Sequence, residues 1–393
     1  MPSGSRAGLA PTRPGNQGPG DVTAPLALSS AYVDERDEEL VLQALRSRRL
    51  ASGPMTERFE RALAERVGAS HVVAVSSGTA ALHLGMRLVG IEPGDEVITS
   101  PFSFIASANA VLFEGGVPVF VDVDPVTLNL DLEAAQQAVT SRTRALLPIS
   151  VFGYPLDYDR LHALAARRGF PIVEDAAEAL GATFRGQPVG SFGHTATFAF
   201  YPNKQMTTGE GGAVAVVSED DAEFVRGLAN QGRSEAGPGL AYDRLGYNYR
   251  LDELSAALGV AQLEKLDRLL AGRERVAARY GALLAEVDGV TTLCANDAEH
   301  VRSWFVYVVF LDESVSRDAV MERLAAAGIA SRPYFPAIHL QPVYRERFGF
   351  EPGMCPVAER AGATGLALPF HTTLSEADQE RVVQALAEAV ATG

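Results

Sequence analysis

Short apolar runs alternate with stretches of helical periodicity between about Ala69 and Val217. The apolar runs predict strands near residues 71, 96, 117, 145, 171, 195 and 212. The periodic stretches predict helices near residues 80, 105, 132 and 158. Such alternation is typical of a mainly parallel sheet covered by helices on both faces. Because open sheets of this kind bind ligands beyond the carboxyl ends of their strands, we expect chemistry-bearing residues there.

One lysine lies between a predicted strand and a glycine-rich turn, in the run Phe198-Ala-Phe-Tyr-Pro-Asn-Lys204-Gln-Met-Thr-Thr-Gly-Glu-Gly-Gly. Another apolar run, Pro171-Ile-Val-Glu-Asp175, ends on a carboxylate. Pyridoxal phosphate needs an amine that holds it as an imine and an anion that keeps its ring nitrogen protonated. Lys204 and Asp175 are candidates for these two roles, although a lysine near a glycine turn, taken alone, is more often a solvated loop residue.

The predicted strand His71–Val75 is followed by Ser-Ser-Gly78-Thr79 and then by an apolar helix. Backbone N–H groups at the start of a helix are unpaired and the helix dipole favours negative charge there, so this turn is a candidate phosphate site. Gly78 allows close backbone approach and Thr79 adds a hydroxyl. The competing interpretation is an ordinary N-cap, because Ser and Thr begin many helices that bind no ligand.

Two aromatic residues follow the predicted strand Glu96–Thr99, at Phe102 and Phe104. One of the two rings could stack on the pyridine ring of the cofactor. Aromatic residues are usually part of the core, however, and neither composition nor spacing chooses between these two.

These segments, in this order, resemble the sugar aminotransferases of the DegT/DnrJ/EryC1/StrS family, which have the aspartate aminotransferase fold type. The resemblance spans nearly the whole chain after about residue 25. The matching motifs are Ala51-Ser52-Gly53-Pro54, Ser77-Gly78-Thr79-Ala80-Ala81-Leu82, Glu174-Asp175-Ala176-Ala177-Glu178, Phe200-Tyr-Pro-Asn-Lys204 with Thr207-Thr-Gly-Glu-Gly-Gly212, and Leu245-Gly-Tyr-Asn-Tyr-Arg250-Leu-Asp252. The resemblance implies PLP-dependent transferase fold type I: a three-layer α/β/α large domain with a mainly parallel sheet, plus a smaller C-terminal α/β domain.

Carried over to this sequence, the family pattern implies that Lys204 forms the imine with pyridoxal phosphate and then moves protons. Asp175 would pair with the ring nitrogen and Phe104 would cover a ring face. Gly78 and Thr79 would hold the phosphate.

Two further positions carry family roles. Glu178 matches the position of a polar residue near the ring hydroxyl, and Asn248 matches an asparagine that reaches the phosphate of the neighbouring subunit. The resemblance therefore implies a homodimer with shared active sites.

One position departs from the family pattern. A phosphate-binding serine is common five residues before the lysine, where this chain has Ala199. Thr195, Thr197 or Asn203 could replace that contact, and a weaker grip on the cofactor is an equally fair expectation. Lys204 itself favours transamination, because relatives that dehydrate sugars have histidine at its position.

Substrate contacts are expected from loops outside these motifs. In the family the turn at Ser52 and Gly53 lies at the substrate mouth, and the segment with Tyr334 and His339 resembles the substrate-side segment. A lone histidine is more often structural. Arg233 and Arg250 are candidate partners for a nucleotide diphosphate, because guanidinium matches phosphate geometry, but a surface salt bridge is as good an explanation for each.

The predicted domain organisation has three parts: a flexible leader over residues 1–25, a large cofactor-binding domain over 26–250 and a smaller domain over 251–393. The leader is rich in Gly, Pro and Ser without hydrophobic periodicity. One long periodic stretch from Leu251 to about Val287 would link the domains. The smaller domain would contain a strand over Trp304–Phe310 and helices over 317–327 and 375–391.

The composition predicts a soluble metabolic enzyme. Lys and Arg total 34 against 49 Asp and Glu, a net charge of -15 that disfavours nonspecific nucleic-acid binding. Cys294 and Cys355 lack disulfide or metal-ligand spacing, so we expect no metal. We also expect the protein in a reducing cytoplasm. We find no apolar run long enough to cross a membrane and no secretory signal, so no membrane partner is expected.

The function expected from the resemblance is transfer of an amino group from glutamate or glutamine to a keto-sugar attached to a nucleoside diphosphate, for deoxyaminosugar biosynthesis. The donor half-reaction would leave pyridoxamine phosphate. One alternative is different chemistry on the same fold, namely aminocyclitol or aminobenzoate formation or sugar dehydration. Another is a noncatalytic sensor, because a shared fold does not guarantee a shared activity.

Overall fold

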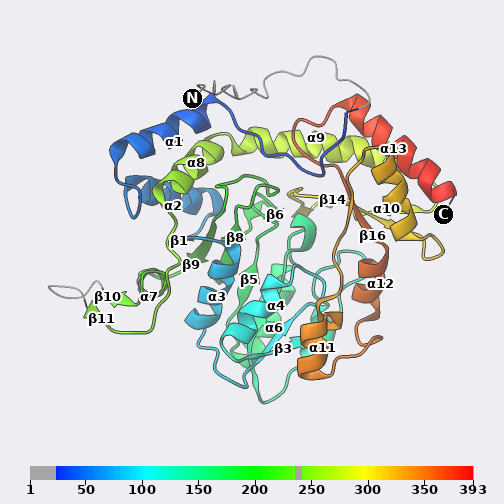
Figure 1. Ribbon diagram of the computed structural model, residues 1–393. Helices are drawn as coiled ribbons and strands as arrows, with labels where there is room; N and C mark the ends of the chain where they lie inside the picture. Colours follow the sequence, from blue (N-terminus) through cyan, green and yellow to red (C-terminus); the bar gives the residue numbers. More distant parts are fainter. Residues whose placement is uncertain (1–23, 235–240, 393) are drawn as a thin grey trace, which may run out of the picture.

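The computed structural model describes residues 24–234 and 241–392, so most of the predicted leader lies outside the described residues. Among them, seven strands form the central sheet in the order β1-β9-β8-β5-β4-β2-β3. Figure 1 labels β1, β9, β8, β5 and β3 of this sheet. The strands are β1 (His71–Val75), β2 (Glu96–Thr99), β3 (Val117–Phe120), β4 (Thr143–Leu147), β5 (Val173–Asp175), β8 (Thr195–Ala199) and β9 (Gly212–Val216). β9 is antiparallel to both neighbours and the other pairings are parallel, which confirms the predicted mainly parallel sheet.

Helices cover both faces of this sheet. They are α2 (Pro54–Val67), α3 (Gly78–Leu88), α4 (Ala106–Phe113), α5 (Leu132–Gln137), α6 (Tyr158–Arg168) and α7 (Glu219–Ala229). Successive strand residues point to opposite faces. Val72 and Ala74 of β1 pack in the cluster that contains α2 and α6, whereas Val73 and Val75 pack in the cluster of α3 and α7. The predicted three-layer α/β/α arrangement is therefore confirmed.

The linking stretch consists of two helices, α8 (Glu253–Glu264) and α9 (Leu266–Leu284), where the sequence predicted one. Lys265 lies between them with a non-helical backbone (φ -115°, ψ 9°). Its ammonium pairs with Asp34 and Asp37 at the start of α1 (Glu35–Ser47). The junction is therefore tied to the N-terminal segment by charges that are buried or partly buried.

The C-terminal part builds on an antiparallel sheet in the order β12-β14-β16-β15. Its elements are β12 (Val290–Thr292), β14 (Tyr307–Leu311), α10 (Arg317–Ala326), β15 (Arg332–Pro333), β16 (Gly365–Leu368) and α13 (Glu376–Ala391). The strand begins at Tyr307 and not at Trp304 as predicted. Leu26 bridges to Ile329, so the N-terminal segment contacts this part; the domain boundaries stay a prediction.

The remaining elements are short strands, helices and turns outside the two sheets described above. They are β6 (Thr183–Phe184), β7 (Gln187–Pro188), β10 (Arg233–Ser234), β11 (Ala241–Tyr242), β13 (His300–Val301), α11 (Pro342–Phe348), α12 (Pro356–Thr364) and the 3₁₀ turns η1 (Val151–Gly153) and η2 (Ile338–Leu340). Within the described residues, every helix is too short or too polar to span a bilayer.

Candidate active site

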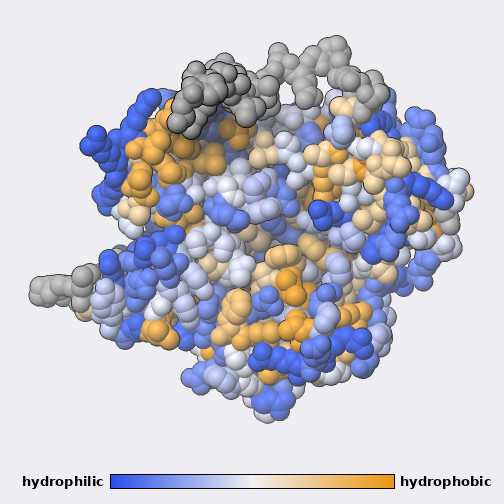
Figure 2. All heavy atoms as spheres, viewed as in Figure 1, coloured by the Kyte–Doolittle hydropathy of each residue, from blue (hydrophilic) through white to orange (hydrophobic). Residues whose placement is uncertain are grey.

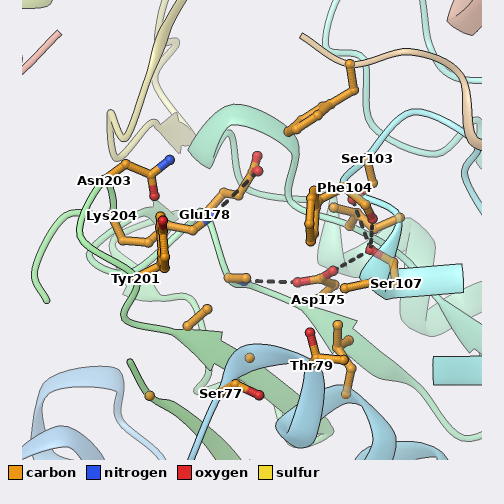
Figure 3. Close-up of a pocket in the computed structure, with 18 of the residues that line it drawn as sticks. Ser77, Thr79, Ser103, Phe104, Ser107, Asp175, Glu178, Tyr201, Asn203 and Lys204 are labelled. Atoms are coloured by element: carbon orange, nitrogen blue, oxygen red, sulfur yellow. Dashed lines mark hydrogen bonds and ion pairs between the residues drawn. The ribbon is translucent and has the colours of Figure 1, made fainter. Parts of the chain in front are cut away.

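A cavity of about 410 Å³ lies beyond the carboxyl ends of β5 and β8, and most of the predicted cofactor residues line it (Figure 3). Those that line it are Gly78, Thr79, Phe104, Asp175, Glu178 and Lys204, and the expected substrate residue Tyr334 lines it as well. They come from loops and helix starts that follow different strands, and they meet as expected for an open sheet. The volume falls in the range of small-molecule sites.

Asp175, the last residue of β5, presents a buried carboxylate to the cavity. Its Oδ2 accepts a hydrogen bond of 2.7 Å from Ser107 Oγ, and its Oδ1 accepts one of 3.1 Å from the backbone N–H of Ala177. Burial raises the pKa of Asp175, and these two hydrogen bonds oppose that rise. A carboxylate in such surroundings favours a cationic partner on its open side, which fits a protonated ring nitrogen.

Lys204 points its amine into the same cavity from the loop after β8 (Figure 3). The Nζ atom lies 3.7 Å from Glu178 Oε1 and 4.1 Å from the centroid of the Phe305 ring. Burial raises the pKa of Glu178 to about 7, although the Lys204 charge opposes this. Glu178 Oε2 also accepts a hydrogen bond of 2.8 Å from the backbone N–H of Phe152. The amine is thus held beside one acid and one apolar ring.

The anion side of the cavity lies at the start of α3. Ser77 caps this helix by accepting a hydrogen bond of 3.1 Å from the backbone N–H of Ala80. Gly78 and Thr79 occupy the first turn, where N–H groups have no acceptor within the helix. A Cβ at Gly78 would lie 2.5 Å from the Cβ of Ala199, so a side chain there would collide. These features fit a phosphate group, and the cavity as a whole therefore fits pyridoxal phosphate.

The residues considered as replacements for a serine at Ala199 differ in position. Thr197 Oγ1 donates a hydrogen bond of 3.0 Å to the Glu174 carbonyl, and Thr195 lines a different cavity. Asn203 lines the candidate site, and its buried Oδ1 has no hydrogen-bond partner among the described residues. Of the three, only Asn203 therefore has a side chain at this cavity.

The two aromatic candidates differ in burial and position. Phe102 is fully buried in a core cluster, whereas Phe104 is 62% exposed and lines the cavity. The position of Phe104 fits a ring that stacks on a bound cofactor.

His339 does not lie at the cavity. Its side chain is fully buried, and its Nε2 atom lies 3.0 Å from Glu359 Oε1. This burial agrees with the structural role that a lone histidine more often has, and a contact between His339 and the sugar stays a prediction.

Of the remaining expected substrate residues, Tyr334 lines the cavity formed by the described residues and the others lie outside it. Ser52 is exposed and the Gly53 N–H donates a hydrogen bond of 3.0 Å to Glu253 Oε1. Arg233 is exposed on β10, and Arg250 donates a hydrogen bond of 3.0 Å to Asn230 Oδ1. Asn248 forms a backbone bridge with the same asparagine. One subunit does not bring these residues to the cofactor site.

Several cavity residues were missed by the sequence reasoning. Ser107 contacts Asp175, and Ser103 Oγ lies 3.0 Å from Ser107 Oγ. Their spacing of four residues after a predicted strand is a signal that both share one side of a helical turn. Tyr201 and Glu210 also line the cavity, within the lysine motif itself.

The comparisons with known proteins agree with this geometry. The model of the DegT/DnrJ/EryC1/StrS aminotransferase family matches residues 31–387. GDP-perosamine synthase of Caulobacter vibrioides is 40% identical over 368 residues, which cover 92% of this chain and 97% of that protein.

Two solved structures show the same fold. The putative sugar aminotransferase Spr1654 from Streptococcus pneumoniae, in its PMP form, is 28% identical, with a TM-score of 0.89 over 94% of this chain and 98% of that chain; its PLP form also has a TM-score of 0.89. The structure of 3-amino-5-hydroxybenzoic acid synthase is 31% identical, with a TM-score of 0.87 over 94% of this chain and all (100%) of that chain.

The predicted fold class and family are thus confirmed. The family match and the putative sugar aminotransferase Spr1654 favour an enzyme over a sensor without catalytic activity. The chain belongs to the DegT/DnrJ/EryC1/StrS aminotransferase family and is a pyridoxal phosphate-dependent aminotransferase.

Proposed function

We propose that the protein transfers an amino group from glutamate or glutamine to a keto-sugar attached to a nucleoside diphosphate, in deoxyaminosugar biosynthesis. The observation that carries the proposal is that the Lys204 amine and the buried Asp175 carboxylate line the same cavity. The name of the relative that is 40% identical, GDP-perosamine synthase, supports a nucleotide-linked sugar as substrate.

The cavity residues have separate roles in this proposal. Pyridoxal phosphate, when bound, supplies the carbonyl that carries the amino group and the ring that accepts electrons. Gly78 and Thr79 hold its phosphate through the first turn of α3, and Phe104 covers a ring face. Asp175 keeps the ring nitrogen protonated. Cofactor orientation thus comes from the start of α3, the segment before α4 and the end of β5.

Proton movement falls to Lys204. Its amine acts as base and acid at the reacting carbon, as positioned amines do in general acid–base catalysis. Glu178, whose Oε1 lies 3.7 Å from the amine, would lie near the ring hydroxyl, the role that its family position implies. The Phe305 ring excludes water from one side of the amine.

Substrate binding requires a second subunit in this proposal. Tyr334 lines the cavity from within the chain, whereas Ser52, Gly53, Arg233 and Arg250 do not. The proposed homodimer brings them, with Asn248, toward a partner's site. Figure 2 shows hydrophobic side chains gathered over α1 and α8, and Leu42, Leu45 and Leu50 are exposed in this part of the chain. Exposed apolar patches of this kind often mark protein interfaces.

A second candidate is amine formation on a non-sugar ring. The similarity to 3-amino-5-hydroxybenzoic acid synthase favours it. Sugar dehydration is disfavoured, because Lys204 stands where the dehydrating relatives have histidine.

The test combines mapping with substrate trials. Borohydride reduction of the cofactor-loaded protein followed by peptide mapping should label Lys204, and Lys204→Ala should lose both label and turnover. Glutamate and glutamine should each be tried as donors, with nucleotide keto-sugars and aminobenzoate precursors as acceptors. Label on another residue overturns the site assignment, and turnover of only a non-sugar acceptor favours the second candidate.

A further inference from the structure

A buried guanidinium lies directly behind the candidate catalytic lysine. Arg273 of α9 is 3% exposed. Its Nη2 donates hydrogen bonds to the carbonyls of Lys204 (2.6 Å) and Asn203 (3.3 Å). Its Nη1 donates a hydrogen bond of 2.9 Å to the carbonyl of Phe305. One side chain thus joins the linking helix, the lysine loop and the segment that enters β14.

The charge of Arg273 has no acidic partner. Among the residues that the structure describes, no carboxylate forms an ion pair with Arg273, and its Nε has no hydrogen-bond partner. Burial lowers the pKa of Arg273 to about 10, so the group stays charged at neutral pH. Burying an unpaired charge is unfavourable unless hydrogen bonds compensate it. Here the compensation comes from three carbonyl groups, two in the lysine loop (Asn203 and Lys204) and one at Phe305.

Two of these carbonyls belong to the residues that fix the Lys204 amine. One is the carbonyl of Lys204 itself, which sets where the side chain begins. The other belongs to Phe305, whose ring centroid lies 4.1 Å from Nζ. The guanidinium therefore controls both the base of the lysine side chain and the surface against which its amine packs.

We infer that Arg273 is a positioning residue for Lys204. The inference rests on the proposed role of Lys204 as the cofactor-binding and proton-moving amine. A planar guanidinium can hold several carbonyls in fixed directions, which a lysine ammonium cannot do. Since a misplacement of about 1 Å can reduce rates by about 100-fold, a rigid lysine loop has a direct catalytic consequence.

The chain offers a matched control. Arg302 is also 3% exposed and also bonds to carbonyls, with Nη1 3.0 Å from the Phe152 oxygen and Nη2 3.3 Å from the Cys294 oxygen. Among the described residues, its guanidinium donates hydrogen bonds to Phe152 and Cys294 and not to Asn203 or Lys204. Arg302→Lys therefore reports the stability loss from replacing a buried arginine without loosening the lysine loop.

The experiment compares Arg273→Lys with Arg302→Lys. Hydrogen exchange in the cofactor-free protein should be about 10-fold faster over residues 201–208 in Arg273→Lys only. With cofactor bound, Arg273→Lys should slow the glutamate half-reaction by about 10- to 100-fold and shift the pH midpoint of the cofactor absorbance. If both variants change these readouts equally, Arg273 is merely structural and the inference is overturned.

Two further measurements keep the outcome clear. If Arg273→Lys does not fold, Arg273→Gln takes its place, because the amide keeps N–H donors but loses the planar guanidinium. Unchanged hydrogen exchange over residues 201–208 and an unchanged pH midpoint in that variant would also overturn the inference. Borohydride mapping of the unmodified protein distinguishes a failure of the proposed function from a failure of the positioning role alone. Label away from Lys204 rejects the proposed function, whereas label on Lys204 with equal arginine variants rejects only the positioning role.

Discussion

The hydroxyl of Ser107, on α4, donates a hydrogen bond of 2.7 Å to Oδ2 of Asp175, at the end of β5. Both side chains are buried, and this bond lowers the pKa of Asp175 against the larger effect of burial. A helix on one face of the sheet thereby helps to set the charge of the carboxylate proposed to face the cofactor ring.

Ser107→Ala should weaken cofactor binding. Without the hydroxyl, the pKa of Asp175 rises further. The carboxylate therefore becomes protonated at a higher pH than in the unmodified protein. We expect about a 5- to 20-fold higher dissociation constant for pyridoxal phosphate at pH 6, and a smaller change at pH 8. Titration by cofactor absorbance measures both. Ser103→Ala is the control, because it removes a neighbouring hydroxyl but leaves the bond to Asp175.

Ala199→Ser should increase the affinity for pyridoxal phosphate. The Ala199 methyl group lies beside the glycine that begins α3, at the proposed phosphate position. A hydroxyl there adds one hydrogen bond, worth about 1 kcal/mol or roughly a fivefold lower dissociation constant. Reconstitution of the cofactor-free protein measures it. Thr195→Ala should change nothing, since Thr195 lines another cavity; unchanged affinity in Ala199→Ser would mean that the phosphate lies elsewhere.

The pKa of Glu178 predicts a pH-dependent stability. Its pKa rises from 4.5 to about 7 on folding, so between these pH values the folded protein keeps a proton that the unfolded chain has released. The stability from this group is present below about pH 4.5 and is lost as pH rises through 7. Glu178→Gln mimics the protonated form and avoids that loss.

Urea unfolding of the cofactor-free protein tests this. The gain in unfolding free energy from Glu178→Gln should be near zero at pH 4.5 and on the order of 3 kcal/mol at pH 8. The exposed Glu286→Gln should show no such trend. A constant difference at all pH values would show that Glu178 has an ordinary pKa in the folded protein.

Local patterns predicted most of the large sheet, because its strands have residues buried on both faces and end in short polar turns. The strands His71–Val75 and Glu96–Thr99 have the expected bounds. The two misses depend on distant partners. Trp304 has strand propensity, but pairing starts at Tyr307, opposite Leu368. The helix break at Lys265 accompanies its contacts with Asp34 and Asp37, more than 200 residues away (228 from Asp37).

The candidate site likewise combines features that local sequence predicts with features that depend on distant partners. Residues that directly follow strands, such as Gly78 and Lys204, could be placed from the sequence because strand ends meet at one edge. The burial of His339 could not be, since it depends on packing against Glu359 from another helix. Arg273 gave no signal at all, because its partners are backbone carbonyls, which every residue has.

Mixed dimers test whether the active sites are shared. Lys204→Ala should inactivate the site in its own subunit, whereas Asn248→Ala should impair the site of its partner, because Asn248 does not line the cavity of its own chain. In a dimer of one Lys204→Ala and one Asn248→Ala subunit, one site carries both defects and the other carries none. Random mixing of equal amounts should therefore restore about a quarter of the sites of the unmodified protein.

Activity after unfolding and refolding the mixture, compared with each variant refolded alone, gives the readout. Lys204→Ala mixed with unmodified protein is the control, and it should retain about half of the sites whether or not they are shared. If the Lys204→Ala and Asn248→Ala mixture shows only the mean of its two components, Asn248 serves its own subunit. The exposed residues Ser52 and Arg233 would then need another route to the substrate.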